Sequence, residues 1–322
     1  MARMNRRSQI DLVECVCYHV ISRCTRQLHL LGGDDDSHDA RKELLLRQLE
    51  RLATYTAVGV AGFSVMDNHV HLLLKVDGEA ARAWSGREVA RRWLGLHPPR
   101  DGYFKPVDVE DEHLAVLASD PAAVEAARAK LMCISQFMKE LKQEVSQQIN
   151  RLDETVGSVW AGRFKCKRVN DEAQLLTTLA YIDLNPFAAG LCDTPEAGEH
   201  TSLAARLGEP SKRQRRATAA QAGSANLCER RGWWMAVGGG QPGAMKPSGS
   251  LMPGTTLTFG AYLKLLDAVA RLLRRGKRRL AVDTQHIAAR LAVTPGGVAT
   301  TVRDWFENGL PWDRPRAASA PG

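Results

Sequence analysis

Two histidines separated by one apolar residue, His69-Val70-His71, begin a strongly apolar run that ends at Val76. In an extended strand, residues two apart point to the same face, with Cβ atoms about 7 Å apart. Two imidazoles placed in this way can converge on one divalent metal ion. The preceding Met66-Asp67-Asn68 is typical of a turn, because Asp and Asn tolerate left-handed backbone. We therefore expect a hairpin that carries a histidine pair at the start of its second strand.

A His-x-His pair alone is also common at ordinary surface and core positions, so a metal site needs support from other residues. A helix predicted over Glu172–Leu184 offers Tyr181 and, one turn further on, Asn185. At about 100° per residue, Tyr181 shares a polar stripe with Gln174, Thr177, Thr178 and Asn185, which predicts an exposed tyrosine. The opposite, core-facing side consists of Leu175, Leu176, Leu179 and Ile182. Asp183 falls inside that apolar side, and the sequence offers no reason for it.

The elements that must position these residues are strands and helices spread over the first two thirds of the chain. Hydrophobic periodicity predicts strands over Val13–Ser22, Ala57–Val65, His69–Val76 and Phe164–Val169, and helices over Ala40–Ala53, Pro121–Leu152 (one long helix or two abutting) and Glu172–Leu184. A segment at residues 78–120, with a short helix over Ser85–Leu96, interrupts the pattern. The site residues would thus come from the second strand of a hairpin and from a helix far along the chain.

The C-terminal third differs in composition. Residues 208–256 are rich in Gly, Ala, Ser, Pro and Arg and are expected to form a flexible basic linker. Thr258–Arg275 has the pattern of an amphipathic helix, and Thr284–Val298 has the spacing of a helix-turn-helix, although packing is favoured over DNA contact there. The expected organisation is a domain over residues 1–207, the linker, and a small helical unit over residues 257–322.

The overall charge favours a polyanionic partner. The 322 residues include 44 Lys and Arg against 36 Asp and Glu, a net charge of +8. Seven cysteines without a Cys-x-x-Cys pair indicate reduced thiols, and no apolar run approaches the roughly 20 residues of a membrane span. We expect a soluble, cytoplasmic protein associated with the nucleoid.

Four segments occur in an order that is specific when they are taken together: Tyr18–Arg23, Met66–Leu74, Trp160–Lys165 and Tyr181–Leu191. They resemble the REP-associated tyrosine transposases, which belong to the HUH superfamily of single-strand nucleases. The resemblance covers about Val13–Leu207, and the insertion and C-terminal extension are similar to those of a longer subgroup.

The resemblance implies an α+β fold, namely a ferredoxin-like antiparallel sheet with helices on one face, plus a helical insertion and a helical C-terminal extension. It implies that Tyr181 attacks a DNA phosphate to form a 5′-phosphotyrosine, and that His69, His71 and Asn185 bind the metal. Mg²⁺ or Mn²⁺ suits such a mixed nitrogen and oxygen site. The expected partner is single-stranded DNA with a hairpin or palindromic repeat, bound by a monomer or a homodimer.

Basic residues just before the tyrosine helix are candidates for DNA contact: Arg163, Lys165, Lys167 and Arg168. A solvated edge strand protected by its lysines explains them equally well. A core or surface role is favoured for His19 over a role as a metal ligand. Two alternatives to a transposase stay open, a domesticated nickase or relaxase-like enzyme and a catalytically silent DNA-hairpin-binding protein; the intact His, Tyr and Asn set argues against the second.

Overall fold

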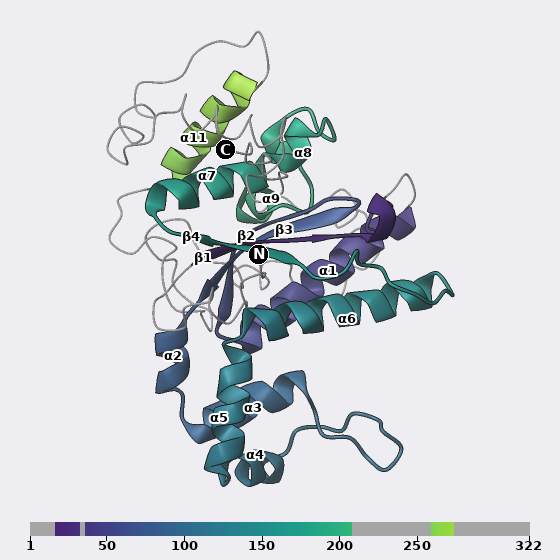
Figure 1. Cartoon of the computed structure of the whole chain (residues 1–322), viewed down its shortest axis with the longest axis vertical. Helices are drawn as coiled ribbons and strands as arrows, with labels where there is room; N and C mark the ends of the chain where they lie inside the picture. The colour runs from purple at the N-terminus through teal and green to yellow at the C-terminus, as the bar shows by residue number, and fades with distance from the viewer. Residues whose placement is uncertain (1–16, 33–35, 208–258, 274–322) are drawn as a thin grey trace, which may run out of the picture.

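A computed structural model describes residues 17–32, 36–207 and 259–273. Its framework is an antiparallel sheet of four strands in the order β2-β3-β1-β4 (Figure 1). The strands are β1 (Cys17–Arg23), β2 (Val58–Val65), β3 (His69–Val76) and β4 (Lys165–Val169). Helix α1 (Asp36–Tyr55) connects β1 to β2, and α6 (Ile134–Leu152) precedes β4. This β-α-β-β-α-β order is that of a ferredoxin-like sheet, so the predicted α+β fold is confirmed.

Helices cover both faces of the sheet (Figure 1). The helices α1 and α6 lie on one face, where residues such as Tyr18, Val20, Leu72 and Leu74 join their leucines in one buried core. The other face carries α7 (Glu172–Asp183), α8 (Asn185–Ala188), α9 (Ser202–Leu207) and α11 (Phe259–Leu273). The expected arrangement, with helices on one face, therefore holds for α1 and α6. The chain after β4 returns across the opposite face and covers it with further helices.

The interrupting segment is helical, as predicted. It contains α2 (Gly78–Ala83), α3 (Gly86–Leu96) and α4 (Asp111–Ala118), and it leads into α5 (Pro121–Leu131). Asp77, Ser85 and Asp120 cap α2, α3 and α5 by accepting hydrogen bonds from backbone amides of the first turn. The helix expected over Pro121–Leu152 is two helices, because Cys133 adopts an extended conformation between α5 and α6.

The tyrosine helix α7 packs closely on β2 at a glycine. A Cβ atom placed on Gly62 would lie 2.5 Å from Cδ1 of Leu179 on α7. The strand is irregular at the same place, with a register shift between Val60 and Gly62. The closeness of α7 to the sheet thus depends on the missing side chain at position 62.

The remaining segments are short or lie outside the described residues. One-turn 3₁₀ helices occur at Thr25–Gln27 and Pro195–Ala197. Helix α11 confirms the amphipathic helix predicted over 258–275, whereas the predicted linker and the helix-turn-helix lie outside the described residues. Within the described residues, no helix is long and apolar enough to span a membrane.

Candidate active site

The sheet register places three histidines on one face. In the pairing of β1 with β3, Ile21 lies opposite His71 and Arg23 lies opposite His69. Side chains two residues apart on a strand share a face, so His19 on β1 joins His69 and His71. This is the face that α7 covers.

The three imidazoles and Tyr181 form one cluster. Nε2 of His19 lies 3.0 Å from Nδ1 of His71, and the ring centroids of His69 and His71 are 4.8 Å apart. The Tyr181 ring meets the His71 ring edge-on, with centroids 5.3 Å apart, and its centroid is 6.0 Å from that of His19. Two sheet strands and a helix from a distant part of the sequence therefore converge on one point.

The predicted exposure of Tyr181 is wrong. Its side chain is buried, with 6% of its surface exposed, and Thr178 and Asn185 of the same stripe are buried as well. The helical periodicity correctly separated a polar side of α7 from an apolar side. At Tyr181 this polar side faces the histidines of the sheet instead of water, whereas Gln174 near the start of the helix is exposed. Helix α11 contributes to the apolar core on this side of the sheet.

Asn185 occupies the expected place in the chain, one helical turn after Tyr181. It begins α8, directly after the end of α7, and it is buried. Among the described residues, its side chain forms no hydrogen bond with His69 or His71. The structure thus brings together His69, His71 and Tyr181, and adds His19, which the sequence analysis placed in the core or on the surface.

Burial keeps the imidazoles neutral at physiological pH. Burial, and then the nearby charge of Lys167, lowers the pKa of His19 to about 3. Burial and Arg23 lower the pKa of His69 to about 4, although Asp67 acts in the opposite direction. Burial and the neighbouring His69, His19 and Arg23 hold the pKa of His71 well below its usual value. Neutral imidazoles are the form that binds metal ions.

The hydrogen bonds of the two strand histidines fit a ligand role. Nδ1 of His69 lies 2.6 Å from Oδ1 of Asn68, and an amide oxygen only accepts, so this nitrogen carries the proton. Nδ1 of His71 is engaged by His19. In both rings Nε2 is the nitrogen outside these hydrogen bonds. Among the described residues, no group of three or more His, Cys, Asp or Glu side chains is arranged to hold a metal ion. A metal here would need an amide such as that of Asn185 and oxygens of the substrate.

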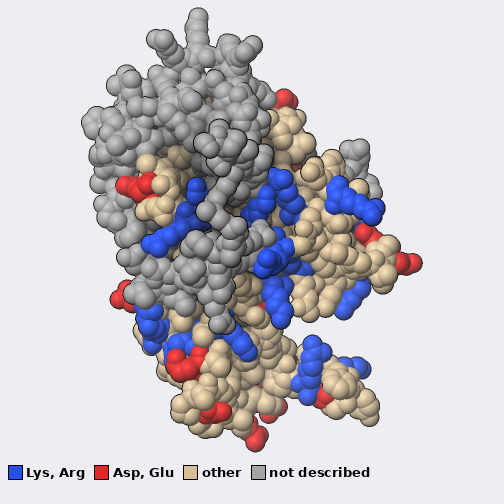
Figure 2. Space-filling view, in the orientation of Figure 1, with Lys and Arg blue, Asp and Glu red and all other residues tan. Residues whose placement is uncertain are grey.

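Basic side chains border the cluster on the edge strand β4. Lys165 pairs with Ile21 and Lys167 with His19, so both lysines share the histidine face, and both are exposed. Arg168 pairs with Tyr18 and thus lies on the opposite face, whereas Arg163 is exposed just before the strand. The view in Figure 2 shows Lys and Arg side chains gathered across the middle of one face of the molecule.

Sequence reasoning missed Arg23 as part of this basic border. Its position opposite His69 places it on the histidine face, and it is exposed. Only the pairing of β1 with β3 reveals this neighbour, because the two residues are far apart in the sequence.

The structure also explains Asp183, the acidic residue on the apolar side of α7. Its carboxylate is fully buried and accepts hydrogen bonds from the Ser202 hydroxyl, the Leu203 amide, the Tyr262 hydroxyl at 2.6 Å and the Arg206 guanidinium at 3.4 Å. Burial nevertheless raises the pKa of this carboxyl group. Four hydrogen-bond donors from α9 and α11 thus allow a carboxylate to occupy a position that helical periodicity assigns to the apolar core.

Two of these donors also bind the sheet. The Ser202 hydroxyl accepts a hydrogen bond of 3.1 Å from the Phe63 amide, and Arg206 donates to the Ala61 carbonyl oxygen. Both backbone groups belong to the irregular part of β2 beside Gly62. The end of α7 that carries Tyr181 is therefore connected to the sheet through α9 and to α11 through Tyr262.

Comparison with known proteins gives one structural neighbour to report. The chain matches no protein-family model and no curated protein in sequence. It is similar to a solved structure described as a REP-associated tyrosine transposase bound to a REP hairpin, with a TM-score of 0.39 and 10% sequence identity, over 65% of this chain and 87% of the other. At this level of similarity, a function for this chain has to rest on the cluster of His19, His69, His71 and Tyr181 itself.

Proposed function

We propose that this protein is a tyrosine-dependent, metal-dependent endonuclease and strand transferase that acts on single-stranded DNA, of the transposase type. One observation carries the proposal: the Tyr181 ring lies 5.3 Å from the His71 ring, within a buried cluster that also holds His69 and His19. A phenol beside neutral imidazoles is the combination needed for nucleophilic attack on a phosphate near a metal ion.

Tyr181 would act as the nucleophile. Its oxygen would attack the phosphorus atom as the bond to the 3′ oxygen breaks, which leaves a 5′-phosphotyrosine and a free 3′-OH. The phosphodiester is kept as a covalent link, so rejoining to another 3′-OH needs no ATP. A free phenol has a pKa near 10 and is a poor nucleophile at neutral pH, which explains the need for activation.

His69 and His71 would hold a divalent ion through their Nε2 atoms, and Asn185 is the candidate for a third ligand. The supporting observations are the neutral state of both rings and the engagement of each Nδ1 in another hydrogen bond. When bound, Mg²⁺ or Mn²⁺ would polarise the phosphate and offset the negative charge that develops on it. Imidazole ligands favour Mn²⁺ of the two.

The proposed substrate is single-stranded DNA next to a hairpin. Tyr181 is only 6% exposed, so a phosphate must enter a recess to reach it, which the backbone of an intact duplex resists. Lys165, Lys167 and Arg23 border the histidine face and are suited to contact the phosphates of an approaching strand.

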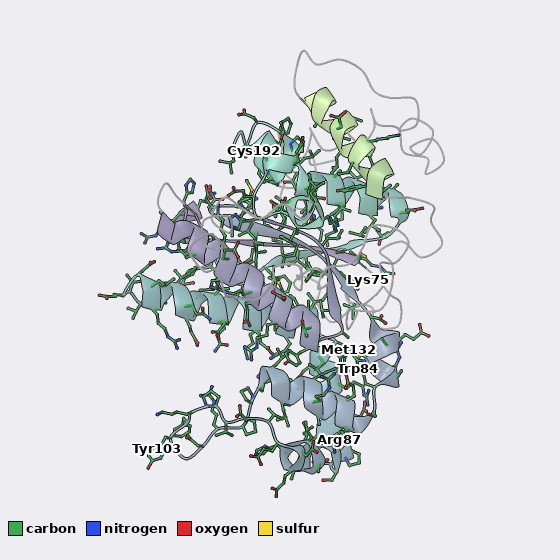
Figure 3. The ribbon with its side chains drawn as sticks, turned by 180° about the vertical axis from the view of Figure 1, so that it is seen from behind. Lys75, Trp84, Arg87, Tyr103, Met132 and Cys192 are labelled. Carbon is green, nitrogen blue, oxygen red and sulfur yellow. The ribbon has the colours of Figure 1, made fainter. Side chains whose placement is uncertain are left out.

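Incubation with labelled single-stranded hairpins from the flanks of the gene tests the proposal. We expect a covalent protein–DNA adduct in Mn²⁺ that mass spectrometry locates at Tyr181, and no adduct for Tyr181→Phe. Tyr103→Phe is the matched control, since Tyr103 is exposed in the loop between α3 and α4 (Figure 3). An adduct at a different tyrosine would refute the assignment, and hairpin binding without any adduct would favour the silent DNA-binding protein.

A further inference from the structure

The proposed chemistry uses His69, His71 and Tyr181 but gives no role to His19. This residue lies on β1, between β3 and β4 in the sheet, and its side chain is 1% exposed. His19 pairs with Leu73, so His71 is its diagonal neighbour on the same face, a separation that aromatic side chains can bridge. A polar ring buried in this position, 3.0 Å from a site residue, calls for a function.

The two strand histidines differ in how their protons are fixed. Asn68 fixes the tautomer of His69, because its amide oxygen can only accept from Nδ1. The hydrogen bond between His19 Nε2 and His71 Nδ1 permits two arrangements, since either nitrogen can be the donor. Only one of them, with the proton on His71 Nδ1, leaves a lone pair on His71 Nε2.

We propose that His19 is a positioning residue that accepts a hydrogen bond from His71 Nδ1 and thereby keeps His71 in the tautomer whose Nε2 can bind a metal ion. The metal-binding part of this inference rests on the proposed function, whereas the hydrogen-bond assignment does not. Groups that accept the second ring proton of a ligand histidine fix its tautomer and orientation, and their loss typically lowers metal affinity about 10- to 100-fold.

The surroundings of His19 suit an acceptor. Its side chain is 1% exposed, and a neutral imidazole has one ring nitrogen that accepts a hydrogen bond. Its ring is tilted by 34° relative to that of His71 and lies 6.0 Å from that of Tyr181, measured between centroids. The neighbouring strands and α7 therefore restrict the rotation of the ring, so the direction of its acceptor is fixed in advance.

Titration of the full-length protein with Mn²⁺ alone, followed by calorimetry, tests the role. We expect His19→Leu to weaken Mn²⁺ binding about 10- to 100-fold, and His19→Gln, whose amide oxygen can accept from His71, to recover most of the loss. His97→Leu is the control, because it removes a partly buried imidazole from α3's C-terminal end, where His97 contacts Glu140. Unchanged Mn²⁺ affinity in folded His19→Leu, or equal loss in the Gln variant, would overturn the proposal.

A second measurement needs neither a variant nor a metal. The ¹⁵N shifts of the imidazoles in the metal-free protein report which nitrogen of His71 carries the proton. We expect a protonated Nδ1 and an unprotonated Nε2; the reverse assignment refutes the role of His19. If the wild-type protein has this tautomer but binds no Mn²⁺, the proposed metal-dependent function fails while the hydrogen-bond assignment stands, so the two failures are distinguishable.

Discussion

Replacement of Tyr262 by phenylalanine should destabilise the protein through a single hydrogen bond. The Tyr262 hydroxyl donates to Oδ2 of Asp183 at 2.6 Å, and neither side chain is exposed to solvent. Phenylalanine keeps the ring packed in the core shared by α7 and α11 and removes only the donor. The carboxyl group keeps its partners on α9, so the loss is partial.

The magnitude depends on the charge of Asp183. A hydrogen bond to a charged group contributes about 1.5–3 kcal/mol, and one between neutral groups about 0.5–1.5 kcal/mol. Because burial raises the pKa of Asp183, the neutral form gains population as the pH falls. We expect Tyr262→Phe to lower the free energy of unfolding by about 1–3 kcal/mol, with the larger loss at the higher of two pH values.

Urea denaturation at 25 °C, followed by circular dichroism, measures this difference. Tyr103→Phe removes a hydroxyl from a side chain that is 86% exposed and should change the stability by less than about 0.5 kcal/mol. If Tyr262→Phe is as stable as this control at both pH values, the buried hydrogen bond does not stabilise α7 and the reasoning is wrong.

Three further perturbations have expected outcomes. The pKa of His69 is lowered from 6.5 to about 4, so between these pH values the unfolded chain binds more protons than the folded protein. As the pH falls from 6.5 to 4, the free energy of unfolding of the metal-free protein should therefore decrease by up to about 1.4 kcal/mol per pH unit for this residue, which urea titrations measure. Gly62→Ala should destabilise by about 1–3 kcal/mol through overpacking, unlike Gly102→Ala, whose new methyl group meets nothing within 4 Å; equal melting temperatures contradict this. Replacement of both Lys165 and Lys167 by alanine should make the dependence of log K for single-stranded DNA binding on log salt concentration less steep, by about 0.7 for each lost phosphate contact. An unchanged slope argues against DNA contact by β4.

Local patterns predicted the parts of the site that a single element defines. Alternation along β3 places His69 and His71 on one face, and the polar stripe of α7 follows from the sequence. The hairpin and the succession of strands and helices along the chain were predictable for the same reason, because hydrophobic periodicity is a local signal.

Features that depend on a distant partner could not be predicted in this way. The polar side of α7 is buried at Tyr181 because the tyrosine meets histidines there, so periodicity alone gave the wrong exposure for this residue. Asp183 contradicts the pattern of its helix until Tyr262, 79 residues later, is known to be its partner. The contact of His19 with His71 depends on the strand register, which the sequence does not specify residue by residue.

The hydrogen bond between Tyr262 and Asp183 also has a consequence for the order of synthesis. Ribosomes make the chain from its N-terminus, so Tyr181 and the histidines exist well before Tyr262 does. Until then the Asp183 carboxylate, two residues after Tyr181, lacks one of its donors and keeps those from α9. A nascent or prematurely terminated chain that ends before Tyr262 thus has every residue of the proposed catalytic cluster but lacks one of the contacts that hold the helix carrying Tyr181.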